Sequence, residues 1–171
     1  MATTYTLISS NVLSSSAASV TFSSIPATYT DLVMRASART DQSNPTATYL
    51  VRYNGSSAAN YSATYLYTGG SSVTSYRDTN ATSMEEGGAT ANTGTANTFG
   101  STEIYIPNYA GTINKPNSSF YVGENNSSSV FLIGIAAGLR SVTDAITSVS
   151  LVSNGNFVTG SSFYLYGIKN S

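Results

Sequence analysis

The chain contains neither cysteine nor histidine among its 171 residues. Without cysteine it cannot form a disulfide, a thiolate zinc site or a cysteine nucleophile. Without histidine it lacks the usual general base near neutral pH, which excludes serine–histidine–aspartate and cysteine–histidine triads and facial metal triads. We therefore expect a protein that is not an enzyme and that holds no cofactor and no metal.

Charged residues are also scarce, at 9% of the chain against about 25% in an ordinary soluble domain. The formal net charge is −1, and the seven basic residues are spread along the sequence. Such a distribution offers no surface that follows a phosphate backbone, so we expect no nucleic acid among the partners. Serine, threonine, asparagine and glycine fill the remaining positions, and these residues suit strands and turns.

Long hydrophobic runs are absent as well, and none approaches the roughly 18 residues of a membrane span. The longest run, over residues 130–137, fits a buried strand. The first residues lack the basic and apolar regions of a signal peptide. We expect a protein that is made in a cytoplasm, is not exported and does not associate with a membrane.

What the chain does contain is aromatic and apolar material, with 13 tyrosines, 6 phenylalanines and a hydrophobic fraction of 40%. That content is too high for a disordered chain. A chain of this length buries roughly two-thirds of its unfolded surface, so we expect one domain with one core over residues 1–171.

The dominant pattern is an alternation of apolar and polar residues, which predicts half-buried strands. In the range 30–40, one face carries Leu32, Met34, Ala36 and Ala38. The stretches that we expect to form strands are 5–9, 20–24, 30–40, 48–53, 101–107, 118–124, 129–137, 146–153 and 161–169. Residues 58–67 fit either a short helix or a strand, and we favour a strand.

About eight to ten short strands at near-regular spacing predict an all-β fold, a single-domain antiparallel β-sandwich or barrel. A jelly-roll-like sandwich is the topology that we prefer. Residues 69–98 show the weakest pattern and include Met84-Glu85-Glu86. An unpatterned stretch of this length is usually functional or disordered, and we expect a long loop that projects from the sandwich.

Few residues could support catalysis. A serine–lysine site would need Lys115, which we place in a turn, or Lys169, near the end of the chain. Glu103 and Glu124 lie on expected strands and could hydrolyse glycosides if they lay about 5 to 9 Å apart. Ordinary solvated strand carboxylates explain this pair better.

Calcium binding is the metal chemistry that the sequence leaves open. Residues 41–44 and 78–80 offer clustered oxygen ligands, but neither stretch has a known loop spacing. Asparagine and aspartate side chains bond to their own backbone in turns, and this accounts for both stretches.

Several short motifs are spread along the chain: Ser23-Ser-Ile-Pro-Ala-Thr-Tyr-Thr-Asp-Leu32, Arg35-Ala-Ser-Ala-Arg-Thr-Asp41, Val51-Arg-Tyr-Asn-Gly55, Asn60-Tyr61-Ser62, Glu103-Ile-Tyr-Ile-Pro-Asn-Tyr-Ala-Gly111, Glu124-Asn-Asn126, Ala137-Gly138-Leu139, Ala145-Ile-Thr-Ser-Val149 and Tyr164-Leu-Tyr-Gly-Ile-Lys169. They resemble motifs of a family of small structural proteins from tailed phages, particularly phages of aquatic bacteria. The resemblance covers nearly the whole chain except residues 69–98. It implies a virion protein assembled in the host cytoplasm, and it brings no catalytic residues.

By analogy with that family and fold, we expect a capsid decoration or cement protein, which forms a homotrimer and binds the major capsid protein or other virion proteins. Tyrosine-rich surfaces suit such contacts. The residues that we expect at these contacts are Arg35, Arg39, Asp41, Met84, Glu85 and Glu86. The alternative is a tail-fibre or receptor-binding module that recognises glycans on the host cell surface, since tyrosine also stacks on sugars.

Overall fold

The computed structural model describes residues 5–127 and 130–169, and every regular element in these residues is a strand. The fold is all-β, as predicted. The strands are β1 (Tyr5–Val12), β2 (Ala17–Phe22), β3 (Asp31–Ala38), β4 (Thr46–Tyr53), β5 (Tyr61–Thr68), β6 (Val73–Ala81), β7 (Met84–Thr90), β8 (Gly100–Ile106), β9 (Lys115–Gly123), β10 (Leu132–Arg140), β11 (Val149–Phe157) and β12 (Ser162–Ile168). No helix in the described residues is long and apolar enough to cross a membrane.

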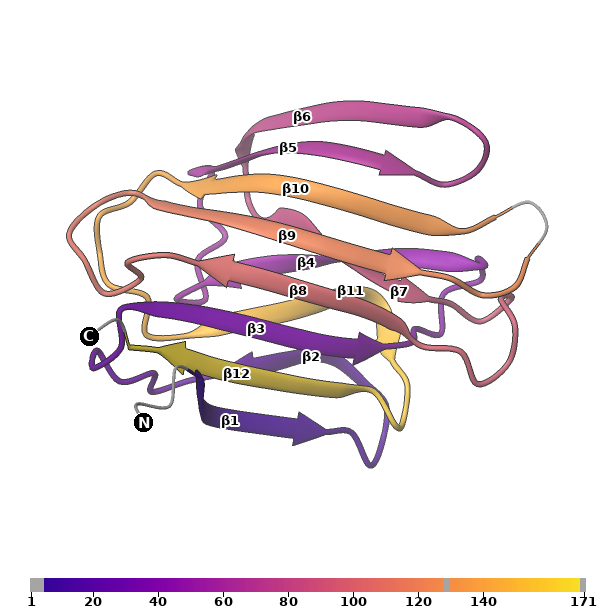
Figure 1. The fold of residues 1–171 in the computed structure, drawn as a ribbon, viewed down its shortest axis with the longest axis horizontal. Coiled ribbons are helices and arrows are strands. Elements are labelled where there is room, and N and C mark those ends of the chain that lie inside the picture. The colour runs from indigo at the N-terminus through magenta and orange to yellow at the C-terminus, as the bar shows by residue number, and fades with distance from the viewer. Residues whose placement is uncertain (1–4, 128–129, 170–171) are drawn as a thin grey trace.

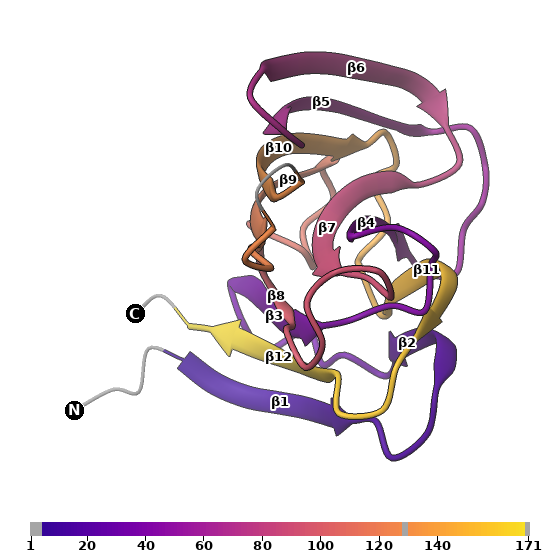
Figure 2. The ribbon, with the colours of Figure 1, turned by 90° about the vertical axis from the view of Figure 1, so that its right-hand side faces the viewer.

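The strands form two antiparallel sheets of unequal size. The larger has the order β1-β12-β3-β8-β9-β10-β5-β6, and the smaller has the order β2-β11-β4-β7. Figure 1 looks onto the larger sheet, with the smaller sheet behind it. Figure 2 shows the two layers from the side, with β5 and β6 curling over one end of the sandwich.

Eight of the strands have jelly-roll topology. β1 pairs with β12, β2 with β11, β3 with β8 and β4 with β7, so the pairs nest inside one another along the chain. This nesting is what a long hairpin folded over on itself produces. The hairpins β9–β10 and β5–β6 then extend the larger sheet beyond β8. The predicted jelly-roll-like sandwich is confirmed.

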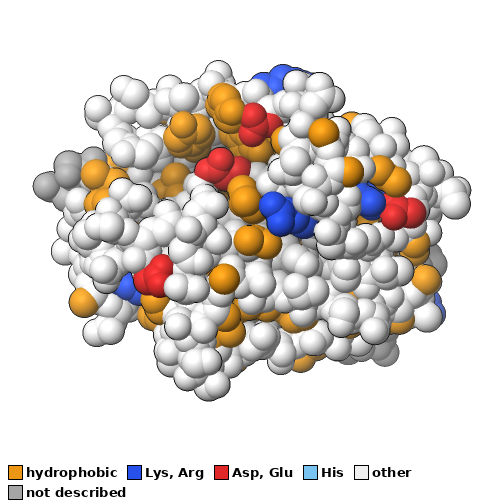
Figure 3. Space-filling view, turned by 180° about the vertical axis from the view of Figure 1, so that it is seen from behind, with side chains coloured by type: hydrophobic (Ala, Val, Ile, Leu, Met, Phe, Trp, Pro, Cys, Tyr) orange, Lys and Arg blue, Asp and Glu red, His pale blue; other side chains and the backbone are white. Residues whose placement is uncertain are grey.

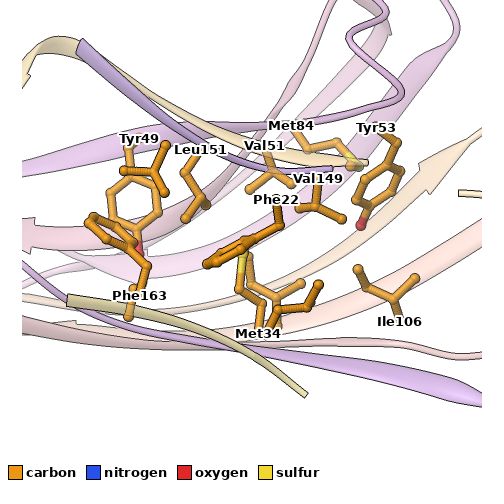
Figure 4. Close-up of a cluster of buried hydrophobic side chains, with 14 of the residues drawn as sticks. Phe22, Met34, Tyr49, Val51, Tyr53, Met84, Ile106, Val149, Leu151 and Phe163 are labelled. Atoms are coloured by element: carbon orange, nitrogen blue, oxygen red, sulfur yellow. The ribbon is translucent and has the colours of Figure 1, made fainter. Parts of the chain in front are cut away.

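The core lies between the sheets and follows the predicted alternation. Figure 4 shows side chains from both layers meeting there. The alternating residues of β3 that we expected on one face are buried, and Tyr49, Val51 and Tyr53 of β4 are fully buried. Phe157 lies edge-on to Tyr49 at 5.3 Å and to Phe163 at 5.0 Å between ring centroids. Such edge-to-face contacts stabilise aromatic pairs beyond the burial of their surface, and they tie the sheets together.

The expected loop over residues 69–98 is wrong, because that range contains β6 and β7. β6 is the last strand of the larger sheet and is mostly exposed, so no apolar face was needed there. β7 is almost entirely buried, but glycines occupy inward positions. A Cβ at Gly87 would overlap the Tyr49 ring, and one at Gly88 would come within 2.7 Å of Tyr121. The neighbouring rings supply the apolar material that the sequence of β7 lacks.

The other sequence expectations agree with the structure more closely. The ambiguous stretch 58–67 forms most of strand β5, as we favoured. Asn54 and Gly55 have φ angles of 54° and 63°, the left-handed backbone of a tight turn after β4. β9 begins three residues earlier than expected. Ser129, the expected start of the strand that became β10, lies outside the described residues.

Candidate interaction surface

Arg35 is the expected contact residue with the clearest surface position. It lies on the outer face of β3, and its Nε donates to Glu103 Oε2 at 2.7 Å. The guanidinium also lies 5.7 Å from the ring centroid of Tyr5 and 5.9 Å from that of Tyr166. Both charged side chains are about half exposed, with side-chain values of 51% and 50%. An exposed pair of this kind contributes about 0–1 kcal/mol to folding and remains accessible to a partner.

Arg39 and Asp41 make contacts within the chain. The Arg39 guanidinium donates to the backbone carbonyls of residues that form the loop between β7 and β8, namely Asn92, Gly94, Thr95 and Thr98. Asp41 accepts hydrogen bonds from the backbone N–H and the side-chain amide of Asn156, both at 2.7 Å. These bonds from Asn156 lower the pKa of Asp41. Both expected contact residues therefore organise loops.

Met84 and Glu86 are fully buried, so the expectation that their side chains contact other subunits is wrong. They point into the core from β7, whereas the intervening Glu85 points the other way and is half-buried. The sequence pattern failed here because it treated the Met84-Glu85-Glu86 segment as a loop. In a strand, alternate residues face opposite sides, and this places Glu86 between the sheets.

Glu86 is a buried carboxyl with one side-chain partner. Its Oε2 accepts a hydrogen bond from Asn117 Nδ2, which also donates to the hydroxyl of Tyr53 at 2.7 Å. Within the described residues, Glu86 Oε1 and Asn117 Oδ1 have no hydrogen-bond partner. A Cβ at Gly138 would overlap both of these oxygens. Burial raises the pKa of Glu86 to about 8, so the carboxyl is neutral over most of the physiological range.

The carboxylates considered for glycoside hydrolysis are not brought together. Glu103 lies opposite Phe120 in the pairing of β8 with β9. Glu124 follows the end of β9 and accepts a hydrogen bond from the backbone N–H of Asn126. Glu124 lies four positions beyond Phe120 along extended chain, or about 13 Å at 3.3 Å per residue. This exceeds the separation that either glycosidase geometry requires.

Lys115 lies in β9, not in the turn that we expected. Its side chain is buried, and its ammonium donates to the backbone carbonyls of Gly111 and Ile113. Burial lowers the pKa of Lys115. The two hydrogen bonds close the turn between β8 and β9. Among the described residues no cluster of three or more acidic side chains could hold a metal ion.

The largest feature that the sequence did not predict is an apolar patch on the outer face of the larger sheet. Five large side chains from four neighbouring strands form this outer apolar patch, each between 43% and 70% exposed: Leu66, Val73, Phe120, Ile133 and Ile135. In the strand pairing, Ile135 lies directly opposite Leu66 on one side and Phe120 on the other. Two open hollows of about 570 and 220 Å³ flank this row.

The signal for the patch was present in the run over residues 130–137, which we assigned to a buried strand. In β10, Leu132, Gly134 and Ala136 do face inward, but Ile133 and Ile135 face outward. An antiparallel sheet with solvent on one side normally shows apolar and polar residues in alternation. A continuous apolar run in such a sheet therefore indicates a second face that a partner could cover.

Comparison of the sequence with protein-family models and with curated proteins finds no match.

Proposed function

We propose that this protein is a structural component of a phage virion, a capsid decoration or cement protein that attaches to the major capsid protein through the outer apolar patch. The patch is the observation that carries the proposal. Contiguous exposed apolar surface on a soluble domain usually marks a site of protein association. The resemblance of the sequence motifs to phage structural proteins supports the choice of a virion subunit as the partner.

The composition of the outer face suits such a contact. Leu66 of β5, Ile135 of β10 and Phe120 of β9 form a continuous row, and no charged side chain separates them. Fully burying a leucine, isoleucine or phenylalanine side chain contributes about 1.5–3 kcal/mol before ordering costs are subtracted. Further along the same row, Glu103 and Arg35 give the patch a charged rim. An apolar centre with a polar rim is the usual anatomy of a protein interface.

In this proposal the protein sits on the outside of the head as a homotrimer and reinforces the joints between capsid subunits. Repeated contacts around a closed ring add avidity without new interactions in each subunit. A sedimentation experiment should then give three times the chain mass of 17.8 kDa. A monomer at micromolar concentration would contradict the trimer but leave the attachment site open to test.

The attachment test uses purified particles that lack the protein. The variant F120T/I135T should bind these particles at least tenfold more weakly than the wild type, a loss of about 1.4 kcal/mol or more. The matched control is Ile113→Thr, because Ile113 is 47% exposed yet lies outside the patch. Both variants change exposed residues, so their melting temperatures should stay close to that of the wild type. Equal binding by F120T/I135T and the wild type would refute attachment through the patch.

The number of copies per particle separates this function from the alternative, a receptor-binding module of the tail. Hundreds of copies in a purified virion are expected for a decoration protein. About three to eighteen copies, the range that tail ring symmetry allows, would contradict decoration and favour the tail.

A further inference from the structure

The side of the molecule opposite the outer apolar patch carries a groove that the proposed virion contacts do not use. The larger sheet has eight strands and the smaller has four, so β5 and β6 extend past β7, the last strand of the smaller sheet. A groove of about 350 Å³ lies at this step, and its lining includes Thr48, Tyr65, Tyr67, Tyr76, Glu85 and Tyr121. We call it the tyrosine groove. Figure 3 shows this face of the molecule, where hydrophobic and acidic side chains gather in a hollow.

The tyrosine rings give the groove a flat aromatic wall. Tyr65 and Tyr76 lie opposite each other in the pairing of β5 with β6, and their rings stack at 5.8 Å with an interplanar angle of 18°. Tyr76 remains 51% exposed, so ring surface stays open to a ligand. Its hydroxyl donates to Asp78 Oδ1 at 2.6 Å, which holds the ring in place. The wall is therefore positioned before any ligand arrives.

Tyr121 forms the floor of the tyrosine groove, and close packing keeps it rigid. Tyr121 is almost fully buried, and its ring occupies space that two glycines leave free. A Cβ at Gly134 would overlap the ring, and one at Gly88 would lie 2.7 Å from it. Burial, followed by the charges of Glu85 and Glu86, raises the pKa of Tyr121 to about 12. The Tyr121 hydroxyl therefore remains protonated at neutral pH.

Polar groups in the groove are only partly used by the protein. The backbone N–H of Glu85 donates to the hydroxyl of Tyr65 at 3.0 Å, and Glu85 Oε1 accepts from the hydroxyl of Thr48. Within the described residues, no hydrogen bond engages Glu85 Oε2. The lining thus combines one carboxylate with hydroxyls that can donate or accept. Glu85 is the one charged residue in the lining.

We propose that the tyrosine groove binds a neutral pyranose unit of a glycan, with the sugar ring against the tyrosine wall and its hydroxyls bonded to Glu85. The C–H edges of a sugar carry partial positive charge and are attracted to the negative face of an aromatic ring. Adjacent sugar hydroxyls are good donors to a carboxylate, and such charge-assisted bonds are stronger than neutral ones. The volume suits a small ligand site, which typically begins at about 300 Å³.

The chemistry of the lining distinguishes this ligand from two others. An acidic sugar would meet the charges of Glu85 and the neighbouring Asp78, which disfavours it. A cationic side chain of a protein would be attracted to the same carboxylates and rings. However, Tyr65 and Tyr76 stack in parallel and do not enclose a cation from several sides. The remaining lining is rich in hydroxyls. A flat wall with many hydroxyls favours a flat ligand that carries hydroxyls of its own.

The test follows the tyrosine ring resonances by NMR while methyl glucopyranoside, galactopyranoside and mannopyranoside are added, each as both anomers. At least one should give saturable shifts with a Kd of about 1 mM, as expected for one small ligand on an exposed site. Tyr76→Ala should weaken that binding at least tenfold, whereas Tyr76→Phe keeps the ring and should stay within about threefold. Glu85→Gln should weaken it through loss of the charged acceptor.

The matched control is Tyr5→Ala, because Tyr5 is 45% exposed and lies on β1, at the edge of the larger sheet opposite β6. It should leave sugar binding unchanged. Absence of saturable shifts with all six glycosides would overturn the proposal, and so would undiminished binding by Tyr76→Ala. Shifts of the groove tyrosines with N-acetyl-arginine amide but with none of the sugars would assign the groove to a protein cation. None of these outcomes depends on attachment to a capsid.

Discussion

Glu86 is a fully buried carboxyl whose pKa lies well above its ordinary value. It lies between the sheets, and burial raises its pKa from 4.5 to about 8. In the unfolded chain the group ionises near 4.5, so between these two values the folded state holds a proton that the unfolded state has released. Stability therefore falls as pH rises through this window, by about 1.4 kcal/mol for each pH unit. The stability that the protonated Glu86 gives the folded state is fully present below pH 4.5 and is lost above about pH 8.

The variant Glu86→Gln tests this sign, because glutamine keeps the shape but does not titrate. At pH 8 the variant should be more stable than the wild type by on the order of a few kcal/mol, and near pH 4.5 the two should be similar. Urea denaturation at both pH values measures the difference. Glu124→Gln is the control, since it makes the same substitution at an exposed position. A larger advantage for Glu86→Gln at pH 4.5 than at pH 8 would contradict the buried neutral carboxyl.

At the scale of elements, β7 is held by its neighbours more than by its own side chains. Glycine within a strand normally weakens it, and β7 contains Gly87 and Gly88 in succession. Here the missing side chains make room for the rings of Tyr49 and Tyr121, which are both almost fully buried. Gly88 therefore allows β7 to approach the larger sheet closely, whereas Gly87 makes room for a ring from β4, its neighbour in the smaller sheet.

This view of β7 predicts that Gly87→Ala is destabilising. The new methyl group would overlap the Tyr49 ring, and overpacking of this kind costs about 1–3 kcal/mol. The control is Gly69→Ala, where the nearest atom lies 3.9 Å from the added carbon. Urea denaturation should give a lower midpoint for Gly87→Ala and little change for Gly69→Ala. Equal midpoints for the two variants would mean that the Tyr49 ring can move aside freely.

At the scale of the whole molecule, the hairpins added to the jelly roll share its core. Tyr61, Ala63 and Tyr65 of β5 belong to the same buried cluster as the residues of β4 and β11. The backbone of Glu85 in β7 also donates to the Tyr65 hydroxyl. The β5–β6 hairpin is thus joined to the sandwich by apolar packing and by a hydrogen bond.

Shared packing predicts one cooperative unfolding transition for the entire chain. Far-UV circular dichroism and tyrosine fluorescence should follow the same thermal curve, because tyrosines lie in the jelly roll and in the added hairpin alike. An earlier transition in fluorescence alone would show that β5 and β6 unfold as a separate unit.

The alternation of side chains was sufficient to predict ten of the twelve strands in the described residues and most of the core, but not β6 or β7. A pleated strand turns successive residues to opposite faces, so the pattern in Leu32, Met34 and Ala36 is a local property that the sequence displays directly. The same alternation in the range 48–53 places Tyr49, Val51 and Tyr53 on one face of β4, and all three are buried. It failed for β7, where the apolar atoms that fill the core belong to rings from other strands.

The sequence by itself determined that this protein is an all-β sandwich without cysteine or histidine chemistry, because composition and period-two patterning are properties of the chain alone. Only the tertiary structure decided which faces are covered. It buried Glu86, left Ile135 and Phe120 exposed, and opened a groove beside Tyr76. Each of these outcomes depends on whether a strand distant in the sequence lies over that residue, and the alternation within one strand does not specify which strand that is.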